Sequence, residues 1–154
     1  MTIDVTEKQF EDLIEKTLLD SGYEKGTKNY DRKLAIDYEI LIRFIQNSQK
    51  EKWDKLEEIH AETTRDEILR ALEKALESES MIHVIRNGFI LSDIKLDCAY
   101  FKPVSSLNPD LKLLYDQNIL SVIRQLHYST KNEKSIDLVF FLNGLPVGTA
   151  ELKD

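Results

Sequence analysis

Apolar residues recur at helical spacing along the first half of the chain. Thr6-Glu-Lys-Gln9 has the form of a capping box, and apolar residues follow every three or four positions as far as Gly22, so a helix is predicted over residues 7–20. Residues 24–33 are predicted to be a loop, because they contain glycine, asparagine and aspartate. The pattern predicts further helices over residues 34–47, around Trp53-Leu56-Ile59, and from a second capping box at Thr64-Arg-Asp-Glu67 to Ser78.

From residue 81 onward the apolar period changes to that of strands. Apolar runs flank Asn87-Gly88, which predicts a β-hairpin over residues 81–86 and 89–94, and a third strand is expected to continue to Phe101. A loop to Pro109 and a short helical turn over residues 110–117 follow. Residues 118–128 fit either a long strand or a helix that ends in a strand. The residues up to 80 are thus expected to be mainly helical and residues 81–154 mainly strands.

Residues 135–154 predict two apolar strands joined by a tight turn at Asn143-Gly144, with Asp137, Glu151 and Lys153 at the open end. A buried carboxylate without a partner costs several kcal/mol, and a divalent cation is one such partner. Aspartate on one strand and Glu-x-Lys on the next is the layout of a metal-dependent phosphodiesterase site. The alternative is a solvated strand end that carries an inert Glu/Lys pair.

The register of this hairpin decides whether the two carboxylates share a face. With a two-residue loop, Asp137 would face Ala150, and Glu151 would point to the other side of the sheet. One extra residue puts Asp137 directly across from Glu151. We therefore predict a three-residue loop, Asn143-Gly144-Leu145, with a bulge, or an equivalent bulge elsewhere in the hairpin.

The charge of the chain is unevenly distributed. The net charge is −7, and the whole excess lies in residues 1–80, where 20 acidic side chains outnumber 13 basic ones. The half with the predicted site is neutral, so DNA affinity through bulk electrostatics would have to come from elsewhere in a larger protein or complex. A phosphate path near the site is suggested only by Arg124, Tyr128, Lys131 and Lys134.

The length and motifs of the chain limit the number of domains and the kinds of site that it can contain. A chain of 154 residues fits one domain. There is no apolar run long enough for a membrane span and no signal peptide, which favours a cytoplasmic protein without a membrane partner. The single Cys98 is expected to be a small buried hydrophobe on a strand. His60, His83 and His127 lack the pair spacing of a metal site, and no phosphate-binding glycine loop is present.

An ordered set of motifs resembles the N-terminal endonuclease domain of the restriction (R) subunit of type I restriction-modification enzymes. The resemblance covers nearly the whole chain. Its motifs are Glu11 through Tyr23, Phe44-Ile-Gln-Asn-Ser-Gln49 with Trp53, Tyr100 through Pro109, Leu114-Tyr-Asp-Gln-Asn118, Arg124-Gln125, Tyr128-Ser129, and Ser135 through Lys153.

The resemblance implies a fold and a set of site residues. The fold would be the PD-(D/E)xK restriction-endonuclease-like fold, an α/β (α+β) mixed sheet flanked by helices, which cuts double-stranded DNA with Mg²⁺. Asp137 and Glu151 would be the metal ligands and Lys153 the catalytic lysine. Glu11 matches a helix-borne acidic position that adds a metal or water contact. Ile136 stands where the family label has proline, a residue without a chemical role.

The resemblance also implies parts that this sequence does not contain. In the family, the domain continues with a Gln-x-x-x-Tyr motif, two ATP-driven translocase domains and a C-terminal helical region, and it works with methyltransferase and specificity subunits. We therefore expect a single-domain fragment, residues 1–154, truncated after the Glu-x-Lys strand, inactive alone and without its own ATP site. Self-association through the exposed strand edge is a further hypothesis. The alternative function is a non-catalytic DNA-binding or subunit-assembly module.

Overall fold

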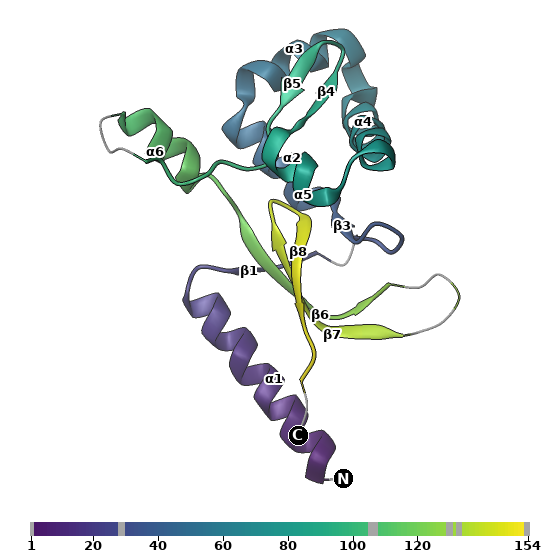
Figure 1. The fold of residues 1–154 in the computed structure, drawn as a ribbon, viewed down its shortest axis with the longest axis vertical. Coiled ribbons are helices and arrows are strands. Elements are labelled where there is room, and N and C mark those ends of the chain that lie inside the picture. Colours follow the sequence, from purple (N-terminus) through teal and green to yellow (C-terminus); the bar gives the residue numbers. More distant parts are fainter. Residues whose placement is uncertain (1, 28–29, 105–107, 129–130, 132–133, 153–154) are drawn as a thin grey trace. The chain divides into compact units, whose positions relative to one another are not determined.

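A computed structural model describes residues 2–27, 30–104, 108–128, 131 and 134–152, with side chains in the first helix from Glu7 onward. The chain divides into two compact units. We call Met1–Asp37 together with Ile119–Asp154 the sheet unit, and Tyr38–Asn118 the helical unit. Figure 1 shows the helices and strands of both. No helix within the described ranges is long and apolar enough to cross a membrane.

The sheet unit is built on a mixed four-stranded sheet with the order β1-β6-β7-β8. Strand β1 is parallel to β6, and the other neighbours are antiparallel. Helix α1 contacts β1 and runs beside this sheet (Figure 1). The mixed sheet with helices confirms the predicted α+β fold class. The bounds are α1 (Thr2–Asp20), β1 (Glu24–Lys25), β6 (Leu120–His127), β7 (Ser135–Leu142) and β8 (Leu145–Ala150).

A small apolar core holds the sheet unit together. Its buried members come from the two long strands and are Ile123, Leu126, Val139 and Phe141. Tyr30, Ala35 and Ile136 pack against them. Tyr30 lies in β2 (Tyr30–Asp31), which pairs with β3 (Ile36–Asp37). Strands β1 and β2 therefore replace part of the loop predicted over residues 24–33, and β3 delays the start of the second helix from residue 34 to Tyr38.

The first helix ends as the sequence predicts. Gly22 has φ +104°, a left-handed conformation that side chains disfavour, and the N–H of Tyr23 donates to the carbonyl of Leu18 at 3.0 Å. This six-to-one bond closes the helix in the manner of a Schellman motif. The predicted capping box is wrong, because Thr6 lies inside α1, which begins a full turn earlier.

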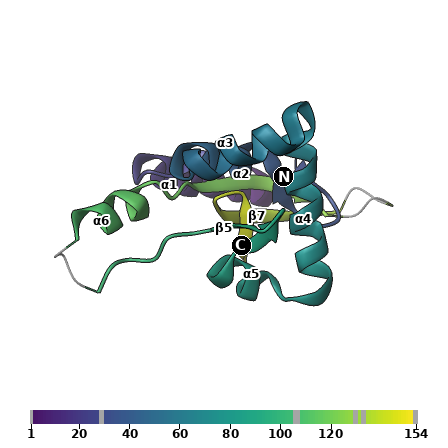
Figure 2. The same ribbon diagram turned by 90° about the horizontal axis from the view of Figure 1, so that it is seen from above.

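The helical unit consists of helices around a short hairpin. Strand β5 contacts α3 and strand β4 contacts α4. Figure 2 shows helices α3 and α4 from above. The Gln49 side chain joins this hairpin to the helices, because it bonds both the N–H and the carbonyl of Asp97. The elements are α2 (Tyr38–Ser48), α3 (Lys50–His60), η1 (Ala61–Thr63), α4 (Thr64–Ser78), α5 (Met81–Asn87), β4 (Phe89–Leu91), β5 (Ile94–Leu96) and α6 (Pro109–Asp116).

The predicted strand over residues 81–86 is wrong, since this segment is helix α5. The Ser80 hydroxyl caps it by accepting from the N–H of His83, and Val84 and Ile85 are buried. Gly88 ends the helix with φ +73°, and an added Cβ there would lie 2.2 Å from the carbonyl oxygen of Leu96. The hairpin turn is instead made by Ser92 and Asp93, both with positive φ.

Three other predictions are decided by the structure. The second capping box is wrong, because the hydroxyl of Thr64 donates to the carbonyl of Ala61 and no side chain caps α4. Residues 120–127 form strand β6, which settles the open choice between strand and helix. Cys98 is buried as predicted, but it follows β5 in a bend, and β5 ends at Leu96 rather than continuing to Phe101.

Candidate functional site

The register of the β7–β8 hairpin brings the two predicted carboxylates to matching positions directly after its last pair. Near the turn Leu142 pairs with Leu145, so the loop has only two residues, Asn143 and Gly144. A register shift between Phe140 and Phe141 then moves the pairing by one residue, and Leu138 faces Ala150. The residues that follow this last pair are Asp137, still within β7, and Glu151, which comes directly after the end of β8. The predicted bulge is confirmed, and it lies in the strand pairing rather than in the loop.

Asp137 is held by hydrogen bonds on both of its oxygens. Oδ2 accepts from the backbone N–H of Leu152 at 2.8 Å, and Oδ1 accepts from Nε2 of Gln125 at 3.2 Å. The bond from Leu152 is the largest influence on the pKa of Asp137, which is lowered below its ordinary value. Partial burial opposes this shift, while the side chains of Gln125 and Glu151 support it. Asp137 is therefore an ionised acceptor at neutral pH.

Gln125 stands across from Asp137 on the neighbouring strand. The β6–β7 pairing runs through Arg124 with Leu138 and through Leu126 with Ile136, which sets Gln125 opposite Asp137. Its Nε2 donates to Oε2 of Glu11 as well as to Asp137, at 3.2 Å in each case. One amide group therefore joins a helix-borne carboxylate to the strand-borne one.

Glu11 is the buried carboxylate of helix α1, with 7% of its surface exposed. Its Oε1 accepts from Nε of Arg124 at 2.6 Å. Arg124 also pairs with Asp12 at 2.7 Å and with Glu15 at 3.5 Å. Burial acts to lower the pKa of Arg124, but bonds and charges from these three carboxylates together raise it above its ordinary value. The arginine that was predicted to contact DNA is thus engaged by the acidic face of α1.

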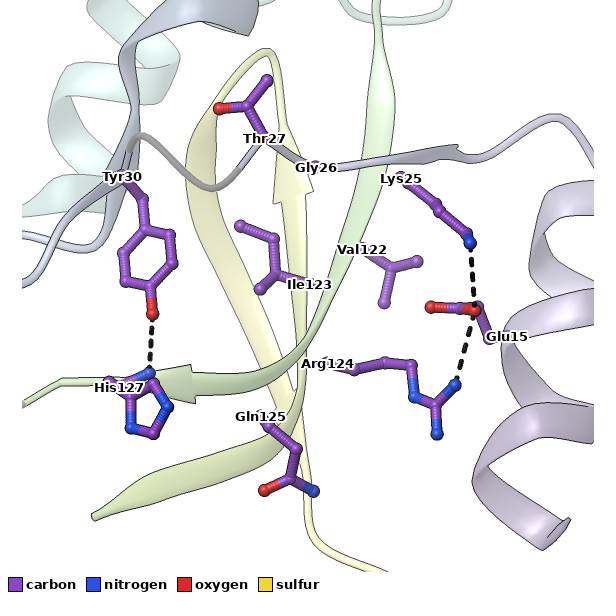
Figure 3. A pocket seen from close by; sticks show the side chains of 10 residues that line it. All are labelled: Glu15, Lys25, Gly26, Thr27, Tyr30, Val122, Ile123, Arg124, Gln125 and His127. Carbon is purple, nitrogen blue, oxygen red and sulfur yellow. Dashed lines mark hydrogen bonds and ion pairs between the residues drawn. The ribbon is translucent and has the colours of Figure 1, made fainter. Parts of the chain in front are cut away.

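Two pockets open on this network. The first has a volume of about 310 Å³, and its walls include Glu11, Gln125, Asp137 and Leu152. The second, of about 430 Å³, lies between α1, β1 and β6 and is shown in Figure 3. In it Glu15 lies between Lys25, at 3.8 Å, and Arg124, so the two cations share one carboxylate. Arg124 and Gln125 line both pockets.

The structure brings together Asp137, Glu11 and Arg124 of the predicted site residues, and its register sets Glu151 across from Asp137. Lys153 lies outside the described residues. Tyr128, Lys131 and Lys134 follow β6 or precede β7, and all three are exposed. Gln125 was missed as a site residue, although it stood in a motif of the resemblance. Its bond to Glu11 spans 114 positions, which no local spacing reveals.

The chemistry of these residues fits a magnesium ion. Mg²⁺ usually takes one or two carboxylates and completes its octahedral shell with water and phosphate oxygens. Asp137 and Glu151 supply two such groups, and Glu151 is near enough to Asp137 to contribute to the lowering of its pKa. Within the described part of the chain, no three Asp, Glu, His or Cys side chains form a ready-made metal-binding group. Asp137 and Glu151 are therefore the first candidates for metal ligands, and Gln125 joins a third carboxylate, that of Glu11, to Asp137.

Comparison with known proteins identifies the family of the chain. Searches of curated proteins and of solved structures gave no significant match. A model of the family described as "Type I restriction enzyme R protein N terminus" matches residues 4–154, which is nearly the whole chain. That segment contains the β7–β8 hairpin with its facing carboxylates and the helix that carries Glu11. The chain thus belongs to the family of type I restriction enzyme R protein N-terminal regions.

Proposed function

We propose that this chain is the nuclease module of a type I restriction enzyme and hydrolyses phosphodiester bonds of double-stranded DNA with Mg²⁺. The observation that carries the proposal is the register shift in the β7–β8 hairpin, because it sets Asp137 across from Glu151. A regular two-residue hairpin would have put the two side chains on opposite faces of the sheet. Membership of a restriction-enzyme family supports DNA as the substrate and a multisubunit assembly.

The roles of the residues follow from their chemistry. Asp137 and Glu151 would hold the metal ion, and Asp137 is suited to this role because its hydrogen bonds keep it ionised. A divalent cation bound there supplies positive charge that stabilises the phosphorane transition state. Lys153 would orient the attacking water or offset the charge that develops on the phosphate oxygens. Water gives up a proton and adds its oxygen to phosphorus, the bond from phosphorus to the leaving sugar oxygen breaks, and that oxygen takes up a proton from the solvent.

The rest of the reaction cycle is assigned to other parts of a type I enzyme. We infer that ATP-driven translocation, target reading and methylation are carried by other domains and subunits, including the methyltransferase and specificity subunits. This chain would then contribute the cutting step, in the cytoplasm. The alternative is a DNA-binding or assembly module in which the carboxylates never bind metal.

Calorimetric titration with Mn²⁺ tests the proposal. Wild-type chain should bind the ion saturably, and Asp137→Asn should lose this binding. The matched control is Asp116→Asn, which removes an exposed carboxylate of α6 that pairs with Lys112. It should bind as wild type does. Equal binding by Asp137→Asn, or no binding by wild type, would overturn the metal-dependent proposal in favour of the binding or assembly module.

A second experiment separates metal binding from cutting. In the complete R subunit, Lys153→Ala should retain Mn²⁺ binding and lose DNA cleavage, because the lysine acts on the reaction and not on the ion. Lys33→Ala removes an exposed lysine from the same unit, one with no proposed role at the site, and should leave cleavage largely unchanged. Full cleavage by Lys153→Ala would remove the lysine from the proposed mechanism.

A further inference from the structure

Gln125 has a backbone conformation that a strand residue rarely adopts. Its φ is +52°, in the left-handed region, although the residue lies in the middle of β6. A side chain other than glycine in this region carries a cost of about 1–3 kcal/mol, and such residues concentrate at functional sites. The conformation is therefore maintained by the contacts that the side chain makes.

The left-handed turn lets two neighbouring residues reach the same carboxylate. Successive side chains of a regular strand point to opposite faces. Here Arg124 donates to Oε1 of Glu11, and Gln125 donates to Oε2. Figure 3 shows the side chain of Arg124 extending toward α1 and the side chain of Gln125, the next residue, pointing away from the strand in another direction. Both oxygens of a buried carboxylate are thereby fixed from a single strand.

The orientation of the Gln125 amide is fixed as well. Its Oε1 accepts from the hydroxyl of Ser135 at 2.7 Å, so its Nε2 faces the two carboxylates. Nε2 has two hydrogens, and it donates to Glu11 and to Asp137. These two carboxylate oxygens can be no farther apart than twice the 3.2 Å of each bond. Each oxygen keeps a lone pair for another partner.

We propose that Gln125 is a positioning residue of the nuclease site, which orients the Asp137 and Glu11 carboxylates for a divalent cation. This inference rests on the proposed function. The carboxamide lies between two negative groups, reduces their repulsion and sets the direction of their remaining lone pairs. Residues that orient metal ligands in this way change metal affinity by about 10–100-fold when they are replaced.

The test is a Mn²⁺ titration by calorimetry on the whole chain, with the melting temperature measured in parallel. Gln125→Met keeps the length of the side chain and removes its hydrogen bonds. It should bind Mn²⁺ about 10–100-fold more weakly than wild type. Ser135→Ala removes only the bond that orients the amide, so a smaller loss of affinity is expected. Gln9→Ala, an exposed glutamine on α1, is the matched control and should bind as wild type does.

The outcomes separate this inference from the proposed function. A lower melting temperature with unchanged Mn²⁺ affinity in Gln125→Met would assign Gln125 a structural role and overturn the inference, while loss of binding in Asp137→Asn would still support the metal site. Absence of binding in wild type would overturn both. If Gln125→Met does not fold, Ser135→Ala decides, since unchanged affinity in that variant overturns the inference and weaker affinity supports it.

Discussion

The carboxylate of Asp137 accepts a hydrogen bond from the backbone N–H of Leu152, with 2.8 Å between Oδ2 and the nitrogen. Leu152 lies between Glu151 and Lys153, so this bond attaches the Glu-x-Lys segment directly to the aspartate of the neighbouring strand. It begins where the backbone pairing of β8 ends, after Ala150. Beyond the last backbone pair, the side chain of Asp137 therefore fixes the position of Leu152.

The stability of the chain should depend on the ionisation of Asp137. Because its pKa is lowered in the folded state, the unfolded chain binds its proton first as the pH falls. The stabilisation is complete above the ordinary aspartate pKa and is lost as the pH falls through the lower folded value. Urea unfolding should therefore show a stability difference between wild type and Asp137→Asn at neutral pH that shrinks in acid. A difference that does not change with pH would contradict this prediction.

Removal of Glu11 should loosen helix α1 from the sheet. Glu11→Ala leaves Arg124 and Gln125 without their shared acceptor, and a lost hydrogen bond to a charged group costs about 1.5–3 kcal/mol. Hydrogen exchange of the α1 amides should become faster than in wild type. Asp12→Ala is the control: it pairs with the same arginine but its side chain is 52% exposed, so a cost below about 1 kcal/mol is expected. Equal exchange in both variants would refute the role of Glu11.

Asn143 should be essential to the turn of the site hairpin. It is fully buried with φ +52°, and its Oδ1 accepts from the N–H of Ile119 at 2.6 Å. Asn143→Ala loses this acceptor and leaves alanine in a left-handed conformation, at a cost of about 2–3 kcal/mol. Asn143→Gly also loses the acceptor but adopts the left-handed conformation without strain, so it should cost less than Asn143→Ala. Denaturant unfolding measures both, and equal losses would show that the left-handed conformation carries no cost.

Cys98 should be unreactive while the chain is folded. Burial raises the pKa of its thiol to about 12, and the charge of Asp97 adds to this effect. Since the thiolate is the reactive form, alkylation at neutral pH should follow unfolding. Between the ordinary value of 9.0 and about 12 the unfolded chain releases this proton more readily, so stability should fall as the pH rises. Cys98→Ala should show a shallower decline, and fast labelling of folded wild type would contradict the prediction.

Two Asn-Gly pairs show how far the sequence alone reaches. Asn143-Gly144 forms a hairpin turn as predicted, because long alternating strands flank it and Asn143 bonds Ile119. Asn87-Gly88 instead ends a helix, which uses the same left-handed glycine. The apolar run before Asn87 is short enough to fit the spacing of a helix or of a strand. The Ser80 hydroxyl, which caps the first turn, favours the helix. The local sequence therefore indicated a positive φ at both Asn-Gly pairs. It did not indicate whether a strand or a helix would precede each pair.

The part of the candidate site that depends only on the pairing of β7 with β8 could be predicted from the sequence. The need for Asp137 to face Glu151 predicted a bulge, and the pairing of β7 with β8 contains one. Gln125 could not be predicted in the same way. Its role depends on a left-handed backbone inside a strand and on a bond to a distant helix, and neither leaves a periodic signal in the sequence. The two-residue strands β1, β2 and β3 were missed for a related reason, since they are too short to show alternation.

The division of the chain into two units also fixes an order of assembly during synthesis. The sheet unit is made of the first and last segments, while the helical unit is one continuous stretch between them. On the ribosome, residues 38–118 are complete before strand β6 begins at Leu120, and strand β8 ends only at Ala150. Asp137 and Glu151 thus come together only when translation has passed the end of the hairpin. A nascent chain would carry a finished helical unit without yet possessing the paired carboxylates.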